Sequence, residues 1–396
     1  MPVNLIDIQK KLASFSHQAK AHHQRVVSRL ETLQERLLAY ADRLDEIKFM
    51  VNHEAETNPR LRCAVPLDEP LDSVIPVSSL PERISLAAAD GSQINPSHHA
   101  RVPFSVINVG VVTMACGSGE TPKVITESAL LDYDTVLQPE GGMLSEGGVA
   151  MKRDLRERVL LLEVVDDLPA PAIAMVDGPL ELIRDPQAMG GFESFVVEYE
   201  TILTGFWQKG LTLLGYIDKS QNNLVGRMLS MIPSDTAEER DNHKESDRNL
   251  SGVRDIRLME TLLGNPGDRS AIFEVYSRTA LSFRPELRLH FFYLNVGAPD
   301  RPHLARVEVP AWVAKDKEKV ALIQAALLDQ TQMMGSRPYP YLLHRAHEEA
   351  LISLDEHQWV EELIVKAFLE DGLDVGELSN KQFLKDMDMK KTRYQR

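Results

Sequence analysis

The stretch RISLAAADGSQINPSHHARVPFSVINVG, residues 83–110, begins with a small, apolar run that leads directly into Asp90 and Gly91. This run and the apolar segment 104–116 predict two neighbouring strands joined by a polar turn over residues 91–99. Either Asp90 is the first residue of a tight turn, or the strand end holds its carboxylate out as a ligand. An Asp-Gly pair is an ordinary turn signal, so the pair alone does not decide between these alternatives.

A second apolar strand ends in the same way, at Asp177 and Gly178 in the segment IAMVDGPL. A carboxylate at a strand end is fixed by the sheet and still reaches solvent, and the glycine lets a ligand approach the backbone closely. Two such strands favour a site for a hard divalent cation, which needs several oxygen ligands. The helix expected between the strands offers a third acid, and position alone does not choose among the candidates Asp154, Glu157, Glu163, Asp166 and Asp167.

The first part of the chain has a helical pattern. Apolar residues recur at three- and four-residue steps from about residue 4 to residue 53, almost without glycine or proline, which predicts a long helical segment with at most one break. Its apolar stripe fits either a face packed on its own domain or a coiled-coil dimer arm. Five prolines between residues 58 and 82 then predict a connection rather than an element.

Strands and helices follow in mixed order up to about residue 370, which indicates an α+β (mixed α/β) fold with a mixed central sheet flanked by helices. The expected division is a helical arm (1–57), a proline-rich connection (58–82), a folded domain (83–370) and a basic tail (371–396). Within the domain, the polar segment 234–249 predicts a mobile loop whose role is open. The tail is either a frayed terminus or a contact for a phosphate or a partner.

Composition restricts the functional class. A formal charge of -15 over 396 residues argues against a protein that coats nucleic acid by electrostatics alone. Cys63 and Cys116 are too few for a disulfide framework or a cysteine zinc site, and they fit a reducing compartment. No apolar run is long enough to span a membrane and no signal peptide is visible, so we expect a cytoplasmic protein. The chain has no phosphate-binding Gly-x-x-x-x-Gly-Lys-Ser/Thr motif, so any ATP hydrolysis must come from another protein.

Several motifs occur in a specific order along the chain. They are AAADGS at Asp90, RDLRE ending at Glu157, AMVDGPL at Asp177, GYIDKS at Lys219, FFYLNV and ARVEVP over residues 291–310, and RPYPYLLHRAHEEALIS over residues 337–353. This succession resembles the NurA nucleases of prokaryotes and covers roughly residues 83–370. The last motif is the most specific, although Arg337 and Pro338 stand where the family usually has glycine.

The resemblance implies an RNase H-like nuclease core with a site built from Asp90, Glu157 and Asp177, which would hold two Mn²⁺ or Mg²⁺ ions with assistance from Tyr339 and His347. The family's arginine-to-glutamate spacing selects Glu157 over Glu163. Lys219 follows a strand and either neutralises a phosphate of the substrate or is an ordinary surface lysine.

The resemblance also implies a homodimer that acts on DNA together with a HerA-type hexameric ATPase. The leading hypothesis is a metal-dependent 5′–3′ exonuclease, with or without single-strand endonuclease activity, in DNA end resection and repair or in defence against phage. The alternative is a non-catalytic NurA-like assembly subunit that docks on the ATPase. Cleavage of RNA is a third possibility, because the fold does not determine the sugar.

Overall fold

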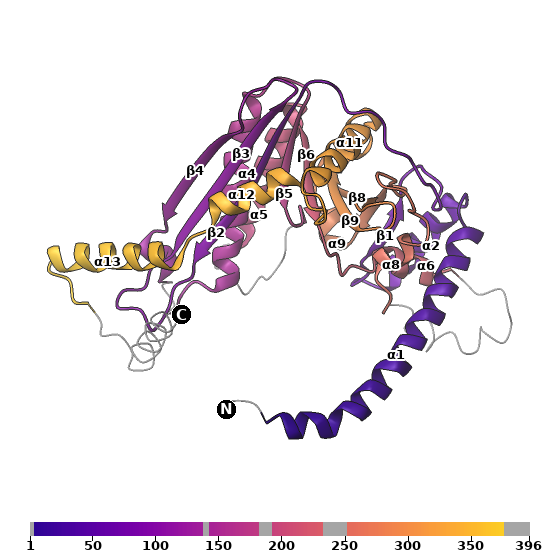
Figure 1. The fold of residues 1–396 in the computed structure, drawn as a ribbon, viewed down its shortest axis with the longest axis horizontal. Helices are drawn as coiled ribbons and strands as arrows, with labels where there is room; N and C mark the ends of the chain where they lie inside the picture. Colours follow the sequence, from indigo (N-terminus) through magenta and orange to yellow (C-terminus); the bar gives the residue numbers. More distant parts are fainter. Residues whose placement is uncertain (1–3, 138–141, 182–191, 233–251, 376–396) are drawn as a thin grey trace. The chain divides into compact units, whose positions relative to one another are not determined.

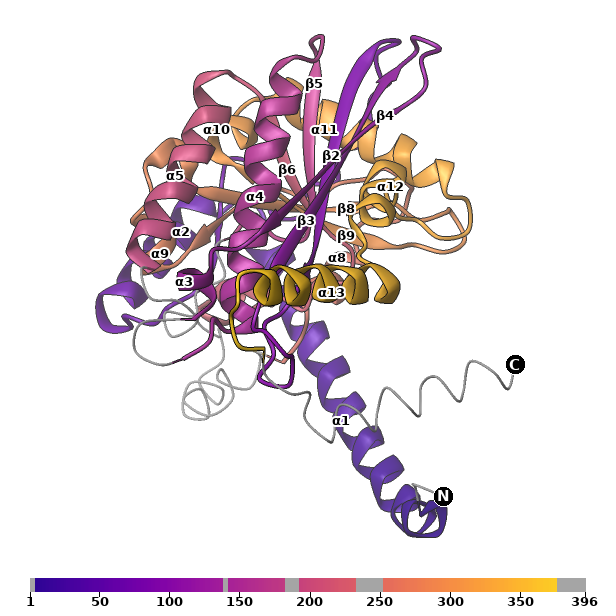
Figure 2. The ribbon, with the colours of Figure 1, turned by 90° about the vertical axis from the view of Figure 1, so that its left-hand side faces the viewer.

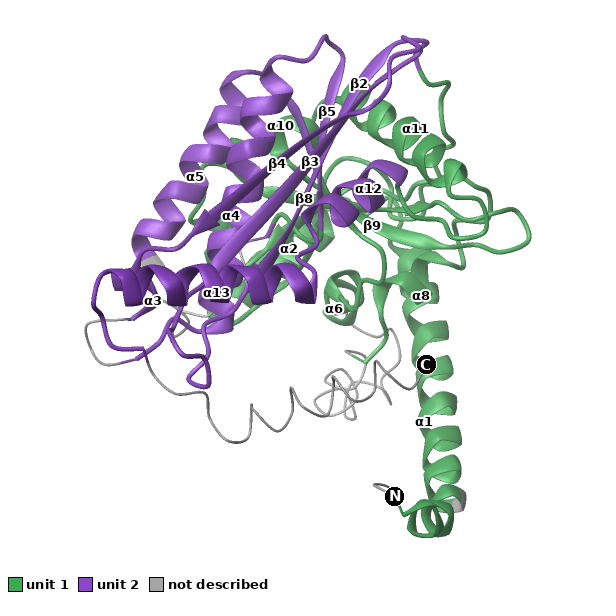
Figure 3. Ribbon diagram, turned by 60° about the vertical axis from the view of Figure 1, so that its left-hand side comes forward, with its two compact units in different colours: residues 1–80, 178–180, 214–340 green, residues 81–177, 181–213, 341–396 purple. Residues whose placement is uncertain are grey.

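The computed structural model describes residues 4–137, 142–181, 192–232 and 252–375. They form two compact units, each assembled from separate stretches of the chain (Figure 3). Unit 1 comprises residues 1–80, 178–180 and 214–340, and unit 2 comprises residues 81–177, 181–213 and 341–396. The loop expected at 234–249 and most of the basic tail lie outside the described residues.

Unit 2 contains four neighbouring strands: β2 (Ile84–Ile94), β3 (Val106–Cys116), β4 (Lys123–Leu130) and β5 (Ala172–Asp177). Strand β3 pairs antiparallel with β2 and with β4, whereas β5 pairs parallel with β2. The helices are α3 (Tyr133–Val136), α4 (Glu146–Asp166), α5 (Phe192–Gln208), α12 (Tyr341–Ala350) and α13 (Leu354–Glu370). Both α4 and α12 pack against β2 and β3, from opposite sides (Figure 2). This mixture of parallel and antiparallel strands between helices confirms the predicted mixed α+β fold.

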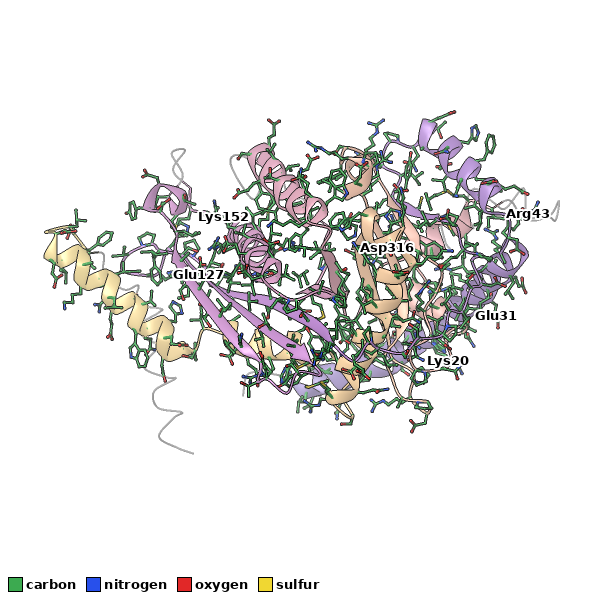
Figure 4. The ribbon with its side chains drawn as sticks, turned by 90° about the horizontal axis from the view of Figure 1, so that it is seen from above. Lys20, Glu31, Arg43, Glu127, Lys152 and Asp316 are labelled. Atoms are coloured by element: carbon green, nitrogen blue, oxygen red, sulfur yellow. The ribbon has the colours of Figure 1, made fainter. Side chains whose placement is uncertain are left out.

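Helix α4 is fixed at its beginning and along its length. The side chain of Ser145 caps the first turn by accepting a hydrogen bond from the N–H of Gly148. Further along, Arg156 donates two hydrogen bonds to Glu127 on β4, with lengths of 2.7 and 2.5 Å. Glu127 is labelled in Figure 4. These contacts determine which side of α4 faces the strands.

The polar turn predicted over residues 91–99 begins later than expected, and the alternative that Asp90 is the first residue of a tight turn is wrong. Strand β2 continues through both residues to Ile94, and its antiparallel pairing with β3 continues without a break, with Asp90 opposite Gly110 and Gly91 opposite Val109. Gly91 serves a different purpose here, because a Cβ atom at this position would lie only 2.6 Å from Oε1 of Glu157 on α4. The glycine therefore allows a helix to approach the strand closely rather than allowing the chain to turn.

Asp177, in contrast, is the last residue of β5, as predicted. Gly178 follows with a φ of +89°, a backbone conformation that glycine adopts without strain. The second Asp-Gly pair is therefore a strand end, although the first is not.

Unit 1 contains a run of antiparallel strands in the order β1 (Cys63–Pro66), β7 (Phe273–Tyr276), β8 (Leu289–Asn295), β9 (Leu304–Pro310) and β6 (Thr212–Ile217). Strand β1 lies within the stretch 58–82 that the prolines predicted to be only a connection, so that prediction is incomplete. The four residues of β1 pair with β7 along their whole length, which is a long-range contact that local composition does not encode.

The helices of unit 1 are α1 (Leu5–Ala39), α2 (Leu44–Thr57), α6 (Leu224–Ser230), α8 (Asp255–Met259), α9 (Arg278–Leu281), the 3₁₀ turn η1 (Pro285–Leu287), α10 (Ala311–Ala314) and α11 (Lys317–Met333). The predicted N-terminal helical segment is confirmed, and its one break falls between α1 and α2.

Helix α1 has two different halves. Leu33 and Leu37 in its second half are fully buried in a cluster that also holds Ile47 and Val51 of α2. Its first half extends beyond the strands of unit 1 (Figure 1) and leaves Leu12 and Phe15 53% and 70% exposed. The second half thus packs on its own unit, and a coiled-coil role for the first half stays a prediction. Within the described residues, no helix is both long and apolar enough to cross a membrane.

Candidate functional site

Asp90 is held in place by contacts on both of its carboxylate oxygens. Oδ1 accepts a 2.8 Å hydrogen bond from the backbone N–H of Gly91, and Oδ2 lies 2.7 Å from Nδ1 of His347 on α12. An ionised carboxylate can only accept hydrogen bonds, so this contact requires the proton of the histidine ring on Nδ1. The Asp90 side chain is 14% exposed and that of His347 is 58% exposed, so the pair is open to solvent on the histidine side.

The close approach of α12 to the strands explains why His347 reaches Asp90. Gly110 lies opposite Asp90 on β3, and a Cβ atom there would lie 2.9 Å from both the carbonyl oxygen of Ala346 and the backbone nitrogen of Ala350. Glycine therefore allows the helix backbone to contact the strand directly. Farther along β2, Ser92 donates a hydrogen bond to the Ala350 carbonyl, which anchors the end of α12.

Asp177 lies beside Asp90. Strands β2 and β5 pair in parallel up to Ala89 opposite Val176, so the next residues, Asp90 and Asp177, stand level with each other. Paired residues on neighbouring strands point to the same face, and neighbouring strands are about 4.8 Å apart. Asp90, which contacts His347, and Asp177 therefore occupy neighbouring positions on adjacent strands.

Glu157 approaches the same strand from the other side. Successive residues of a strand point to opposite faces, and Gly91, the neighbour of Asp90, faces Glu157 on α4. Glu157 is 3% exposed, whereas Glu163, Asp166 and Asp167 of the same helix are exposed to solvent. Among these four acids, only Glu157 is thus buried against β2, and it is close enough to Asp90 for the two carboxyl groups to interact electrostatically.

The environment of Glu157 disfavours its charged form. The pKa of its carboxyl is raised to about 8, chiefly by burial and next by the nearby Asp154, while Arg158 and Arg153 act to lower it. Nε of Arg153 lies 3.1 Å from Oε1 of Glu157, but the alignment of the two groups does not make a hydrogen bond.

Arg153 is the residue of this site that the sequence interpretation did not assign. It interacts electrostatically with Glu157, Asp154 and Asp90 at once, and its pKa is raised although burial acts to lower it. Arg153 and Glu157 are separated by four residues on a helix, a spacing at which side chains meet, so RDLRE already contained this signal.

The acids do not form a ready-made metal site. Within the described residues, no group of three or more His, Cys, Asp or Glu side chains is arranged to hold an ion. The donor chemistry nevertheless fits a hard cation, because Asp90 and Asp177 are neighbouring carboxylates and Glu157 carries a buried oxygen without a hydrogen bond. The metal-binding role of the three acids stays a prediction.

Tyr339 and Lys219 belong to unit 1. Tyr339 precedes α12 by two residues, and its ring packs edge-on against that of Tyr216, with centroids 5.5 Å apart and planes at 88°. Lys219 is exposed directly after β6. Their catalytic and substrate-binding roles stay predictions.

A family model, the NurA domain, matches residues 84–352, which is more than half of the chain and includes Asp90, Glu157, Asp177, Tyr339 and His347. The chain belongs to the NurA family. This confirms the resemblance seen in the order of the motifs. Comparison with curated protein sequences gives no match.

The crystal structure of the NurA nuclease from Sulfolobus solfataricus is similar to this NurA-family chain, with a TM-score of 0.54 and 13% identity, and the match covers 92% of this chain and 98% of that one. It supports a shared fold across nearly the whole chain. Two weaker similarities are to the catalytic domain of human endonuclease V (TM-score 0.31, 12% identity, 71% and 83% covered) and to Drosophila Piwi (TM-score 0.30, 11% identity, 67% and 29% covered).

Proposed function

We propose that this NurA-family chain is a metal-dependent DNA nuclease that removes nucleotides in the 5′–3′ direction, with Asp90, Asp177 and Glu157 as metal ligands. The observation that carries the proposal is the level placement of Asp90 and Asp177 on adjacent parallel strands, with His347 hydrogen-bonded to Asp90. Two neighbouring carboxylates repel each other, and a bound cation offsets that repulsion.

When bound, Mn²⁺ or Mg²⁺ supplies Lewis acidity and lowers the pKa of water. The residues of the chain orient the reacting groups. Asp90 is fixed by the Gly91 N–H and by His347, so its carboxylate keeps one direction. With Nδ1 occupied by Asp90, the exposed Nε2 of His347 is the ring atom that can exchange a proton with the substrate or hold a phosphate oxygen.

Tyr339 and Lys219, both in unit 1, are proposed to contact the substrate. Tyr339 presents an aromatic ring on which an unpaired base can stack, and its hydroxyl can donate a hydrogen bond. Lys219 supplies a positive charge for a phosphate.

The negative net charge of the chain indicates that its action on DNA depends on a partner protein. The chain carries a formal charge of -15 and has no nucleotide-binding motif, so grip on duplex DNA and energy for translocation must come from elsewhere. The proposal therefore includes a homodimer that works with a HerA-type hexameric ATPase in the cytoplasm, in end resection and repair or in phage defence.

A second candidate function is a non-catalytic assembly subunit of the same ATPase. It is favoured by the lack of a preformed cluster of three metal-ligating side chains among the described residues. The two functions differ in whether Asp90 is needed for a metal-dependent reaction.

Digestion of linear duplex DNA, labelled at either the 5′ or the 3′ end, tests both candidates. Wild type and Asp90→Asn are assayed with and without Mn²⁺ and a HerA-type ATPase, and Asp134→Asn on α3 serves as a matched control for loss of a carboxylate charge. We expect Mn²⁺-dependent digestion from the 5′ end in wild type and the control, and none in Asp90→Asn with its folding unchanged.

Absence of digestion by wild type in every condition would instead establish the assembly role. Digestion by the pure protein that is as processive in physiological salt as digestion by the mixture would refute the dependence on a partner.

A further inference from the structure

Unit 1 contains a cavity of about 830 Å³, and three segments form most of its walls. The first is the turn after β6, with Asp218 and Lys219. The second is the loop between β8 and β9, residues 296–303. The third runs from the last turn of α11 to Tyr339, and Pro266 adds a further contact from elsewhere in the chain. Two family motifs, GYIDKS and RPYPY, therefore meet in one cavity although they are more than one hundred residues apart in the sequence.

The cavity concentrates unpaired positive charge. Lys219, Arg301 and Arg337 line it, one from each of the three segments, and within the described part of the chain none of them forms an ion pair. The lining has two carboxylates, Asp218 and Asp300, against these three cations, and Asp218 is already engaged because its Oδ1 lies 2.6 Å from Nε2 of His303. A local excess of cations is unusual on a chain with a formal charge of -15, and it points to an anionic ligand.

Hydrogen bonds fix the conformation of the loop that carries Arg301. Two backbone hydrogen bonds, of 3.2 and 3.0 Å, close the tight turn between Ala298 and Arg301. The fully buried side chain of Asn295 accepts hydrogen bonds from the N–H groups of Gly297 and His303, and donates one to the backbone of unit 1. Arg301 is therefore held over the cavity by a defined backbone.

The lining also offers apolar surface next to these charges. Pro299 and Pro338 form part of it, and the ring of Tyr339 is supported edge-on by Tyr216. Apolar and aromatic surface beside separated cations is the combination that binds single strands, because unpaired bases stack while the cations contact the backbone.

We propose that this cavity binds the phosphodiester backbone of a single strand of DNA through Lys219, Arg301 and Arg337. The inference rests on the proposed function for the nature of the substrate, and it adds a strand-holding subsite in unit 1 to that function. Three cations on three separate segments suit consecutive phosphates of one strand better than a single phosphate group. A paired duplex does not present its bases to the proline and tyrosine surface.

Binding of a fluorescein-labelled oligothymidylate tests the proposal, measured by anisotropy in EDTA so that no cleavage occurs. Wild type is compared with the triple variant Lys219→Ala, Arg301→Ala and Arg337→Ala over a range of salt concentrations. Each phosphate contact on a single strand contributes a slope of about -0.7 to the plot of log K against log salt, so we expect the slope to be shallower by about 2 in the variant. Loss of three charge-assisted contacts is also expected to weaken binding at low salt by about tenfold or more.

The matched control removes three exposed cations of unit 1 that lie outside the cavity lining: Lys10→Ala, Arg60→Ala and Arg257→Ala. This control changes the net charge by the same amount, and we expect its salt slope to stay that of wild type. An unchanged slope in the cavity variant, or an equal change in the control, would overturn the proposal.

Competition with inorganic phosphate and with thymidine 5′-monophosphate separates a strand from other sources of phosphate. We expect the unlabelled oligonucleotide to displace the probe at a far lower phosphate concentration than either small molecule. Equal displacement at equal phosphate concentration would show a site for a single phosphate and refute a strand-holding subsite. Because the assay contains no metal, failure of the nuclease proposal would leave this measurement intact.

Discussion

Replacing Glu157 by glutamine should make the protein more stable at alkaline pH and leave it nearly unchanged at acid pH. The native carboxyl titrates at about 8, compared with an ordinary value of 4.5, chiefly because it is buried. Between these two values the unfolded chain has lost the proton while the native protein keeps it, so native stability falls as pH rises.

The size of the effect follows from the two pKa values. Each pKa unit corresponds to about 1.4 kcal/mol, so the wild type should lose about 3.5 kcal/mol through this group between pH 5 and pH 8. A glutamine has no proton to lose. The difference in unfolding free energy between Glu157→Gln and wild type should therefore widen by that amount over this interval.

Urea unfolding of the metal-free proteins at half-unit pH steps measures the difference. Glu163→Gln is the control, because that side chain is exposed on the same helix, and its difference from wild type should not change with pH. Added Mn²⁺ should restore stability to wild type at pH 8 and leave Glu157→Gln unaffected, because a cation selects the charged carboxylate. A pH-independent difference between Glu157→Gln and wild type would refute the raised pKa and the reasoning built on burial.

Three further predictions concern the framework. Gly110→Ala should destabilise the protein by about 1–3 kcal/mol and reduce nuclease activity, because the added Cβ would lie 2.9 Å from backbone atoms of α12. Urea unfolding and DNA digestion measure the two effects. Gly142→Ala is the control and should be close to neutral, because a Cβ there meets no atom within 4 Å. Burial lowers the pKa of His290 from 6.5 to about 4, so wild-type stability should fall by about 1.4 kcal/mol per pH unit as pH drops between these values; the same fall in His290→Asn would show that another group is responsible. The side chain of Asp316, labelled in Figure 4, caps the first turn of α11. Asp316→Ala should lower the unfolding free energy by about 1 kcal/mol, whereas Asp316→Asn should keep most of the stabilisation from the cap. Thermal unfolding of the two variants measures this order of stability.

Local pattern was sufficient for most of the elements. Apolar periodicity predicted the N-terminal helices, the strands that lead to Asp90 and Asp177, and the strand within residues 104–116, because period and turn residues are properties of short segments. The order of the motifs was sufficient to identify the family. The apolar run before Asp177 was sufficient to predict the end of its strand, because β5 does end at that residue.

Long-range strand pairing determined the secondary structure at the two places where local sequence signals failed. The Asp90-Gly91 pair left a tight turn open as an alternative, but pairing with β3 and the approach of Glu157 keep both residues inside β2. Strand β1 exists among prolines because β7 offers it a partner. In both places the backbone hydrogen bonds come from residues distant in sequence, so composition near the segment does not reveal them.

Residue types and motif order identified the acids, histidine and tyrosine that are candidates for the site, and the family to which they belong. Their arrangement came from tertiary contacts: Asp90 level with Asp177, Glu157 rather than Glu163 buried against β2, and a cavity lined by three unpaired cations. The physical reason is that residue type sets what a side chain can do, whereas burial, register and the close approach of helices set which side chains meet.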